Sequence, residues 1–156
     1  MSKPPRSAEK KNDALPLTVT HRVRDTCLCL HVQRAARALA RRFDEELRPL
    51  DLTNGQFSLL MSLNVPEPRS IGSAANLLAM DRTTLTAALK PLERRGLLKV
   101  AIDREDRRGR LLTLTPAGRA LLRKAYPVWQ QTHAAIERQV TACPPGDLRA
   151  ALRALA

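Results

Sequence analysis

Hydrophobic positions near the start of the chain recur with helical spacing. Between residues 21 and 48, apolar or small side chains form two adjacent rows. These are Val23, Cys27, Leu30, Ala35, Ala38, Phe43 and Leu47, and beside them Leu28, Val32, Ala36 and Leu39. A stripe this wide is typical of a helix that is covered from two sides. The pattern predicts one long helix over 21–48, stopped by Pro49, that packs on its own domain and on a second subunit.

The segment before this helix has a different character. Residues 1–20 are polar, contain three prolines and show no periodicity. Such a segment cannot bury enough apolar surface to fold by itself. We therefore predict a flexible basic arm over residues 1–20.

Three shorter helices are predicted in the middle of the chain, each beginning at a capping residue. The caps are Thr53 (with Gln56 in a capping box), Ser70 and Asp81, and the helices cover 54–64, 71–79 and 82–95. Pro91 lies inside the last helix and predicts a bend there. Gly96 follows it as a typical C-terminal cap.

A strand pattern follows the third short helix. Residues 97–102 are mostly apolar and residues 111–115 alternate, which predicts two strands of a hairpin. The loop between them, 103–110, reads DREDRRGR. The hairpin is therefore predicted to carry an arginine-rich tip.

The C-terminal part of the chain is predicted to be helical again. Thr115 and Pro116 form a strong helix start, because proline suits the first helical position. The helix is expected to reach about residue 141, with a kink at Pro127. A Pro-Pro-Gly sequence at 144–146 then breaks the chain before a short amphipathic helix over 147–155.

Composition agrees with a mainly helical fold. The chain has 156 residues, enough for one domain, and only 3% are aromatic, so the core must consist of leucine and alanine. The order of short helix, turn, second helix and hairpin is that of a winged helix-turn-helix. We predict a mainly α fold with a small β-hairpin wing. Residues 51–115 are expected to form a DNA-binding region, and residues 21–50 and 116–156 a helical dimerisation region.

The net charge suggests the partner. There are 27 Lys and Arg against 15 Asp and Glu, a net charge of +12. Such a charge attracts polyanions, either nucleic acid or an anionic membrane surface. The sequence has no run of eighteen apolar residues, so no membrane span is predicted. It has no apolar signal core, and its three cysteines do not suggest a disulfide framework, so we expect a cytoplasmic location.

The predicted helix 82–95 has the side chains that a major-groove helix needs near its N-terminus. Arg82 can donate to guanine or phosphate, and Thr83, Thr84 and Thr86 are short enough for close approach to the duplex. Lys90 is suited to a backbone phosphate. An ordinary solvated helix with a good cap is the alternative interpretation of these residues.

The hairpin tip adds a second basic element. Its arginines, Arg104, Arg107, Arg108 and Arg110, alternate with Asp103, Glu105 and Asp106. A narrow minor groove attracts inserted arginine. The alternative is a charge-mixed soluble turn. The helix pair, the hairpin and the net charge together favour binding of double-stranded DNA over either alternative.

Two rival classes of function remain to be weighed. A basic RNA-binding protein would need aromatic or glycine-rich stacking surfaces, and this chain has almost no aromatic residues. The sequence contains no Walker, GxSxG or HExxH motif and no Cys/His set with metal-ligand spacing. We therefore expect no enzymatic activity, no cofactor and no metal.

Residues from about 27 to 140 resemble the MarR family of bacterial regulators. The resemblance is carried by LDLTNGQFSLLMSL and by LKPLERRGLLKVAIDREDRRGRLLTLTPAGRALL. It implies a nucleoid-associated homodimer, commonly a repressor, that reads a pseudo-palindromic operator, with the first and last two helices as the interface. It also implies that Asp106 orients an arginine and that Arg107 reaches the minor groove. Gly109 stands where many relatives have serine, which weakens one possible phosphate contact.

The resemblance also suggests what the protein senses. Family members usually respond to a small phenolic or other aromatic acid, and His31, Arg34 and Phe57 are candidates for an effector pocket by position. A single histidine in such a helix is more often structural. The alternative signal is oxidation.

Cys29 falls where hydroperoxide-sensing relatives carry a reactive cysteine. A thiolate there can oxidise and shift the DNA-reading helices. Those relatives have tyrosines at the positions of Gln33 and Phe43, and a helical cysteine is often simply packed. Thiol-based sensing is therefore kept as an alternative to a small-molecule effector.

Overall fold

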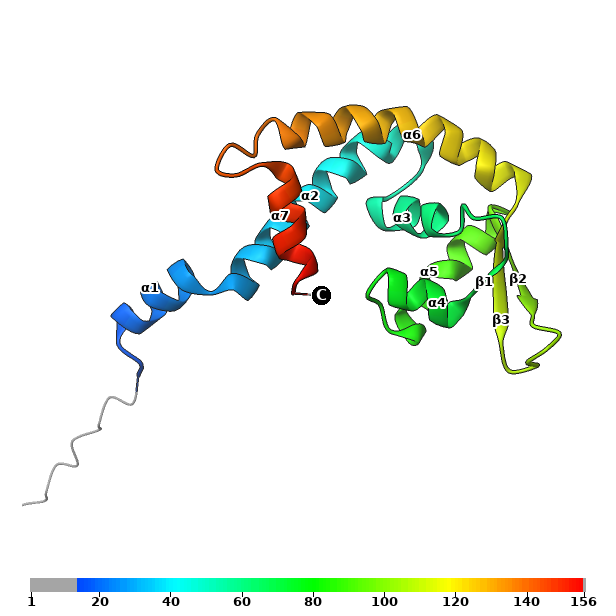
Figure 1. Cartoon of the computed structure of the whole chain (residues 1–156), viewed down its shortest axis with the longest axis horizontal. Helices are drawn as coiled ribbons and strands as arrows, with labels where there is room; N and C mark the ends of the chain where they lie inside the picture. Colours follow the sequence, from blue (N-terminus) through cyan, green and yellow to red (C-terminus); the bar gives the residue numbers. More distant parts are fainter. Residues whose placement is uncertain (1–13, 156) are drawn as a thin grey trace, which may run out of the picture. The chain divides into compact units, whose positions relative to one another are not determined.

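The computed structural model describes residues 14–155, in two units that divide between Arg37 and Ala38 (Figure 1). Most of the predicted basic arm, residues 1–13, lies outside the described residues. The elements in chain order are α1 Leu17–Thr26, α2 Leu28–Leu47, η1 Arg48–Leu50, α3 Asn54–Ser62, β1 Arg69–Ser70, α4 Ile71–Leu77, α5 Arg82–Arg94, β2 Leu98–Ile102, β3 Arg110–Leu114, α6 Pro116–Glu137 and α7 Pro145–Arg153.

The prediction of one helix over 21–48 is wrong, because the chain forms two helices that are separated at Cys27. This residue has an extended backbone with ψ 104°. The Thr26 hydroxyl donates to the Arg22 carbonyl, a local bond that competes with continued helix. The Asp25 carbonyl, left without a helical partner by the break, contacts the His31 ring nitrogen at 3.3 Å. Residues 17–20, predicted as part of the arm, belong to α1.

The capping predictions are confirmed. Thr53 and Gln56 form the expected capping box, and Ser70 accepts from the backbone N–H of Ser73. Asp81 and Thr115 cap α5 and α6 in the same way. Gly96 follows α5 with φ +68°, a left-handed conformation that glycine adopts without steric cost.

Several helix ends differ from the prediction. α4 stops at Leu77 because Ala79 has φ 50° and cannot extend the helix. α6 ends at Glu137 rather than near 141, and α7 begins at Pro145 rather than at 147. α5 and α6 are continuous through Pro91 and Pro127, each of which lacks the N–H for a helical hydrogen bond.

The hairpin is part of a three-stranded antiparallel sheet in the order β1-β3-β2. β2 and β3 pair from Leu98 opposite Leu114 to Ile102 opposite Arg110. The short strand β1, which the sequence did not predict, pairs Arg69 with Leu112. The third strand ties the start of α4 to the base of the wing.

The core confirms the expectation of a leucine-rich interior. Its fully buried large side chains are Leu47, Leu60, Leu63, Leu85, Leu92, Leu98 and Leu112. They come from the end of α2, from α3 and α5, and from the sheet, so one core holds the helix-turn-helix and the wing together. The fold is mainly helical with a small β wing, as predicted. Among residues 14–155, no helix is both long and apolar enough to cross a bilayer.

Candidate nucleic-acid interface

The start of α5 is held by the Asp81 carboxylate. One oxygen accepts from the backbone N–H of Thr84 at 2.8 Å, and the other accepts from the Thr84 hydroxyl at 2.5 Å. The hydroxyl, followed by the backbone N–H, lowers the pKa of the Asp81 carboxyl below its ordinary value. The first turn of α5 is therefore fixed while its outer surface is exposed to solvent.

The three threonines of α5 differ in the hydrogen-bonding capacity that they keep. Thr84 donates its hydroxyl proton to Asp81, and Thr86 donates to the Arg82 carbonyl at 2.6 Å. Among the described residues, the Thr83 hydroxyl has no hydrogen bond, so it keeps both a donor and an acceptor. Thr84 and Thr86 offer an acceptor oxygen and a methyl group.

Arg82 and Lys90 complete the exposed face of α5. With Thr83, Thr86 and Ala87 they line a shallow hollow of about 340 Å³. Both charged side chains are exposed. The structure thus brings four of the five predicted residues of α5 together around this hollow, which carries two positive charges, whereas Thr84 is not among its lining residues.

The wing tip is shaped by its acidic residues. Asp103 accepts from the backbone N–H of Glu105, and Asp106 accepts from that of Arg108, both at 2.9 Å. The resemblance implied that Asp106 orients an arginine side chain. Among residues 14–155, Asp106 makes no ion pair and instead fixes the backbone of the turn.

The arginines of the tip fall into two groups. Arg110 donates to the carbonyls of Arg107 and Gly109, so its guanidinium supports the turn. Arg104 and Arg107 are exposed and line a hollow of about 440 Å³ with Ile102 and Asp103. These two side chains, together with that of the exposed Arg108, are therefore available to a polyanion.

Gly109 is explained by lack of space in the tip. A Cβ atom there would lie 3.0 Å from the Asp106 carbonyl oxygen and 3.1 Å from the Asp103 Cβ. A serine at this position would require the turn to open. The departure from the family pattern is therefore consistent with a tighter turn.

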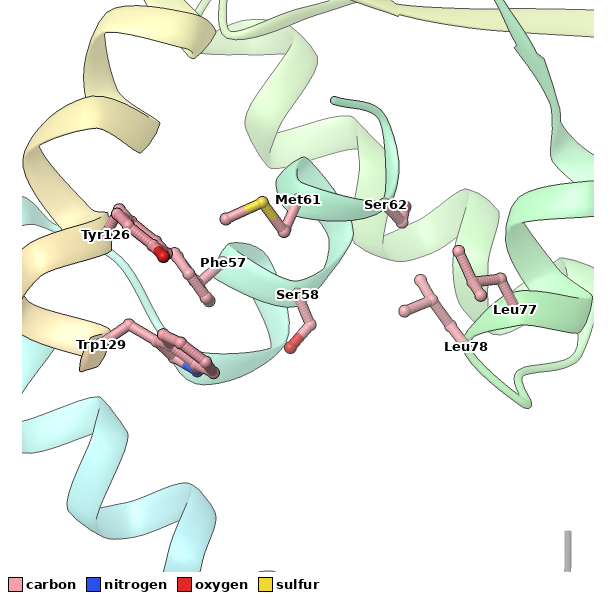
Figure 2. A pocket seen from close by; sticks show the side chains of 8 residues that line it. All are labelled: Phe57, Ser58, Met61, Ser62, Leu77, Leu78, Tyr126 and Trp129. Atoms are coloured by element: carbon pink, nitrogen blue, oxygen red, sulfur yellow. The ribbon is translucent and has the colours of Figure 1, made fainter. Parts of the chain in front are cut away.

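A cavity of about 620 Å³ lies between α3, the end of α4 and α6 (Figure 2). Figure 2 shows the rings of Phe57, Tyr126 and Trp129 gathered on one side of it, with Leu77 and Leu78 opposite. The Trp129 ring is stacked with those of Tyr126 and His133, at centroid distances of 6.0 and 4.7 Å. The flat, largely apolar wall suits an aromatic ligand.

Of the predicted effector residues, Phe57 lines this cavity. Tyr126 and Trp129 were missed, although their spacing on a predicted helix places both on one face. His31 and Arg34 lie on α2 in the unit that ends at Arg37, so their role stays a prediction. Cys29 lies there too; it is exposed, and its Sγ accepts from the Gln33 side-chain amide at 3.1 Å.

Comparisons with known proteins point to a single family. The MarR family profile matches residues 52–109. The transcriptional regulator TtmR of Methylorubrum extorquens is 37% identical over 97 residues, which span 62% of this chain and 50% of TtmR. The multiple antibiotic resistance protein MarR of Escherichia coli is 30% identical over 103 residues, 65% of this chain and 72% of that protein.

Solved structures agree with the sequence relatives. The regulator MosR of Mycobacterium tuberculosis, in a complex with DNA, superposes with a TM-score of 0.76 at 35% identity and covers 83% of this chain and 92% of its own. A mutant of Escherichia coli MarR in a complex with operator DNA gives a TM-score of 0.76 at 25% identity, with coverages of 85% and 96%. On the shared fold, the matched wing and these relatives, the chain belongs to the MarR family of winged-helix transcriptional regulators.

Proposed function

We propose that the protein regulates transcription as a homodimer that binds double-stranded DNA, and that it has no enzymatic activity. The observation that carries the proposal is the capped, exposed N-terminal face of α5 beside a hairpin tip where, among the described residues, the exposed side chains of Arg104, Arg107 and Arg108 make no hydrogen bond or ion pair. The major groove admits one helix, and the adjacent minor groove attracts arginine. The DNA in the MosR and MarR structures supports the same assignment.

Each exposed side chain has a role that follows from its free atoms. Arg82 and the Thr83 hydroxyl donate to bases or phosphates, and Lys90 contacts a phosphate. Thr84 and Thr86, whose protons are engaged, accept from the amino groups of adenine or cytosine or contact the thymine methyl. In the wing, the exposed arginines Arg104 and Arg107 enter the minor groove, while Arg110 and Asp106 hold the tip in shape.

We assign residues 51–115 to the DNA-binding region. The homodimer is supported by apolar surfaces outside this region. No residue of α1 is buried, and Leu17 and Val23 are 67% and 53% exposed. On α7, Leu148 and Leu152 are also exposed. We assign residues 21–50 and 116–156 to the dimerisation region. A two-fold dimer presents two copies of α5 and the wing to a pseudo-palindromic operator.

Replacing Lys90 with alanine is expected to weaken binding to the duplex upstream of the gene. The affinity should also fall less steeply with salt, so that the negative slope of log affinity against log salt becomes smaller in magnitude by about 1. The reason is that a phosphate contact releases a counterion. Fluorescence anisotropy at several salt concentrations measures both quantities, and the stoichiometry should be two chains per duplex. Lys124→Ala on α6 removes the same charge from an exposed site that is not among the proposed DNA contacts and serves as the control.

Several outcomes would contradict this proposal. If random duplex DNA bound as tightly as the upstream duplex, the protein would not recognise a specific sequence in that duplex. Tighter binding of single-stranded RNA than of duplex DNA would favour an RNA-binding protein. If Lys90→Ala and Lys124→Ala changed the salt slope equally, only the net charge would matter and α5 would not be the reading helix.

We further propose that the cavity of Figure 2 binds a small aromatic or phenolic effector that changes the affinity for DNA. Trp129 is the chain's one tryptophan and lies in the cavity wall, so its fluorescence reports occupancy directly. Adding 2-hydroxybenzoate is expected to quench this fluorescence and to weaken DNA binding over the same concentration range. The ring stacks on an aromatic wall, which stabilises such complexes by about 1 kcal/mol beyond burial.

The Leu77→Phe variant tests whether the quenching comes from the cavity. Leu77 lines it but is 60% exposed, so a larger ring there narrows the cavity without removing a core side chain. Quenching should be lost or should need much more ligand. Quenching that is unchanged in Leu77→Phe would place the ligand elsewhere.

Oxidation is tested in the same assay with an organic hydroperoxide. A thiol signal predicts that oxidised wild-type protein loses DNA binding and recovers it with dithiothreitol, while Cys29→Ser keeps binding after oxidation. This result would favour oxidation of Cys29 over an aromatic effector as the signal. The exposed Sγ of Cys29 beside the Gln33 amide is the feature that keeps this alternative open. Unchanged DNA binding after oxidation would remove it.

A further inference from the structure

Gly72 on α4 lies directly beneath the side chain of Arg82 on α5. A Cβ atom built on Gly72 would lie 3.1 Å from Nη2, 3.6 Å from Cζ and 3.8 Å from Nε of Arg82. The guanidinium group therefore rests against the Cα atom of Gly72, in the space that any other side chain would fill. The contact therefore links the half-buried start of α4 with an exposed side chain at the start of α5.

The backbone does not explain why this position is glycine. Among the described glycines, Gly96 has a positive φ, whereas Gly72 is an ordinary helical residue in the first turn of α4. Glycine in a helix is less favourable than alanine, because it loses more conformational freedom on folding. The feature that distinguishes Gly72 is instead that the Arg82 guanidinium occupies the space of its missing side chain.

Arg82 has few other restraints. It is exposed, and among the described residues it makes no ion pair. A long side chain that is free to rotate loses that freedom on binding, whereas a planar guanidinium already held in one orientation loses less. The contact with Gly72 is the close approach that the structure records for the Arg82 guanidinium on the side of α4.

We propose that Gly72 is a positioning residue for DNA binding, acting through Arg82 and not by touching DNA itself. The inference rests on the proposed function, since it concerns how one predicted DNA contact is prepared. A methyl group at residue 72 displaces the guanidinium, which is the movable partner, and leaves α4 intact. Stability and DNA affinity should therefore change in opposite directions.

The experiment compares Gly72→Ala, Arg82→Ala, the double variant and Gly55→Ala. Gly55 is the matched control, because it is also the second residue of a helix and its Cβ would meet nothing closer than 4.0 Å. We expect Gly72→Ala to keep or raise Tm by roughly 2 °C. Its affinity for the operator should fall about two- to tenfold, the effect of ordering one long side chain.

The double variant decides whether Gly72 acts through Arg82. When Arg82 is present, Gly72→Ala should weaken DNA binding. In a protein that already carries Arg82→Ala, it should cause no further loss of DNA affinity. Gly55→Ala should leave affinity unchanged. Equal losses in both backgrounds, or no loss in the wild type, would overturn the inference.

A measurement without DNA separates this inference from the proposed function. Nitrogen-15 relaxation of the Arg82 Nε–H group should show an ordered side chain in the wild type and a mobile one in Gly72→Ala. If the side chain is ordered as expected but the wild type does not prefer duplex DNA, the proposed function fails and the contact stands. If Arg82 is equally mobile in both proteins, the positioning role is wrong whatever the protein binds.

Discussion

The Gly118→Ala variant is expected to lose about 3 kcal/mol of unfolding free energy, because overpacking against rigid backbone is not relieved by side-chain rotation. A Cβ atom on Gly118 would lie 2.1 Å from the Leu97 carbonyl oxygen, 3.1 Å from its carbon and 3.2 Å from Cδ2 of Leu114. The same carbonyl oxygen accepts from the backbone N–H of Thr115 at 3.1 Å. Neither the start of α6 nor the residue before β2 can therefore move away alone.

Urea denaturation followed by circular dichroism measures this loss. Gly146→Ala is the matched control, since Gly146 lies in the first turn of α7 and its Cβ would meet nothing within 4 Å. Its stability should change by less than about 0.5 kcal/mol. A Gly118→Ala variant as stable as Gly146→Ala would show that α6 does not approach the Leu97 carbonyl so closely.

The Leu85→Ala variant should lower the free energy of unfolding by about 2–5 kcal/mol. Leu85 lies in the first turns of α5 and is completely buried, so the truncation removes contacts and leaves a cavity under the DNA-reading helix. Chemical denaturation measures the loss. DNA affinity per folded molecule should fall as well, because the residues on the outer face lose their support.

Leu77→Ala provides the comparison for Leu85. It makes the same chemical change on the neighbouring helix, where the side chain is 60% exposed, and should cost less than about 1 kcal/mol. Similar losses in the two variants would mean that the core does not extend beneath α5. If Leu85→Ala is destabilised but binds DNA with unchanged affinity, DNA binding does not depend on the packing of α5 on the core.

The helix-turn-helix and the wing were predictable because their signals are local. Thr53, Ser70, Asp81 and Thr115 each mark a helix start by a bond to a backbone N–H within three residues, and the structure shows all four bonds. The alternation before and after the charged tip likewise fixes a hairpin. Local chemistry of this kind can be read directly from neighbouring letters.

The features that were missed depend on weak or distant signals. Nothing in the apolar periodicity marks the break at Cys27, because the rows continue past it while the backbone does not. The two-residue strand β1 owes its existence to pairing with β3, more than forty positions away in the sequence. The contact of Gly72 with Arg82 requires the turn between α4 and α5, whose geometry the sequence does not specify.

The aromatic wall of the cavity was also not predicted, and it lies on a turn of α6 with an unusual hydrogen-bond pattern. Pro127 lies between Tyr126 and Trp129 and has no N–H to donate to the turn before it, so α6 is more compliant there than in its hydrogen-bonded turns. At its N-terminal end, the helix is anchored by Thr115 and by the tight fit of Gly118. The two stacked rings of the cavity wall are therefore carried by a turn of α6 that has one backbone hydrogen bond fewer than its neighbours.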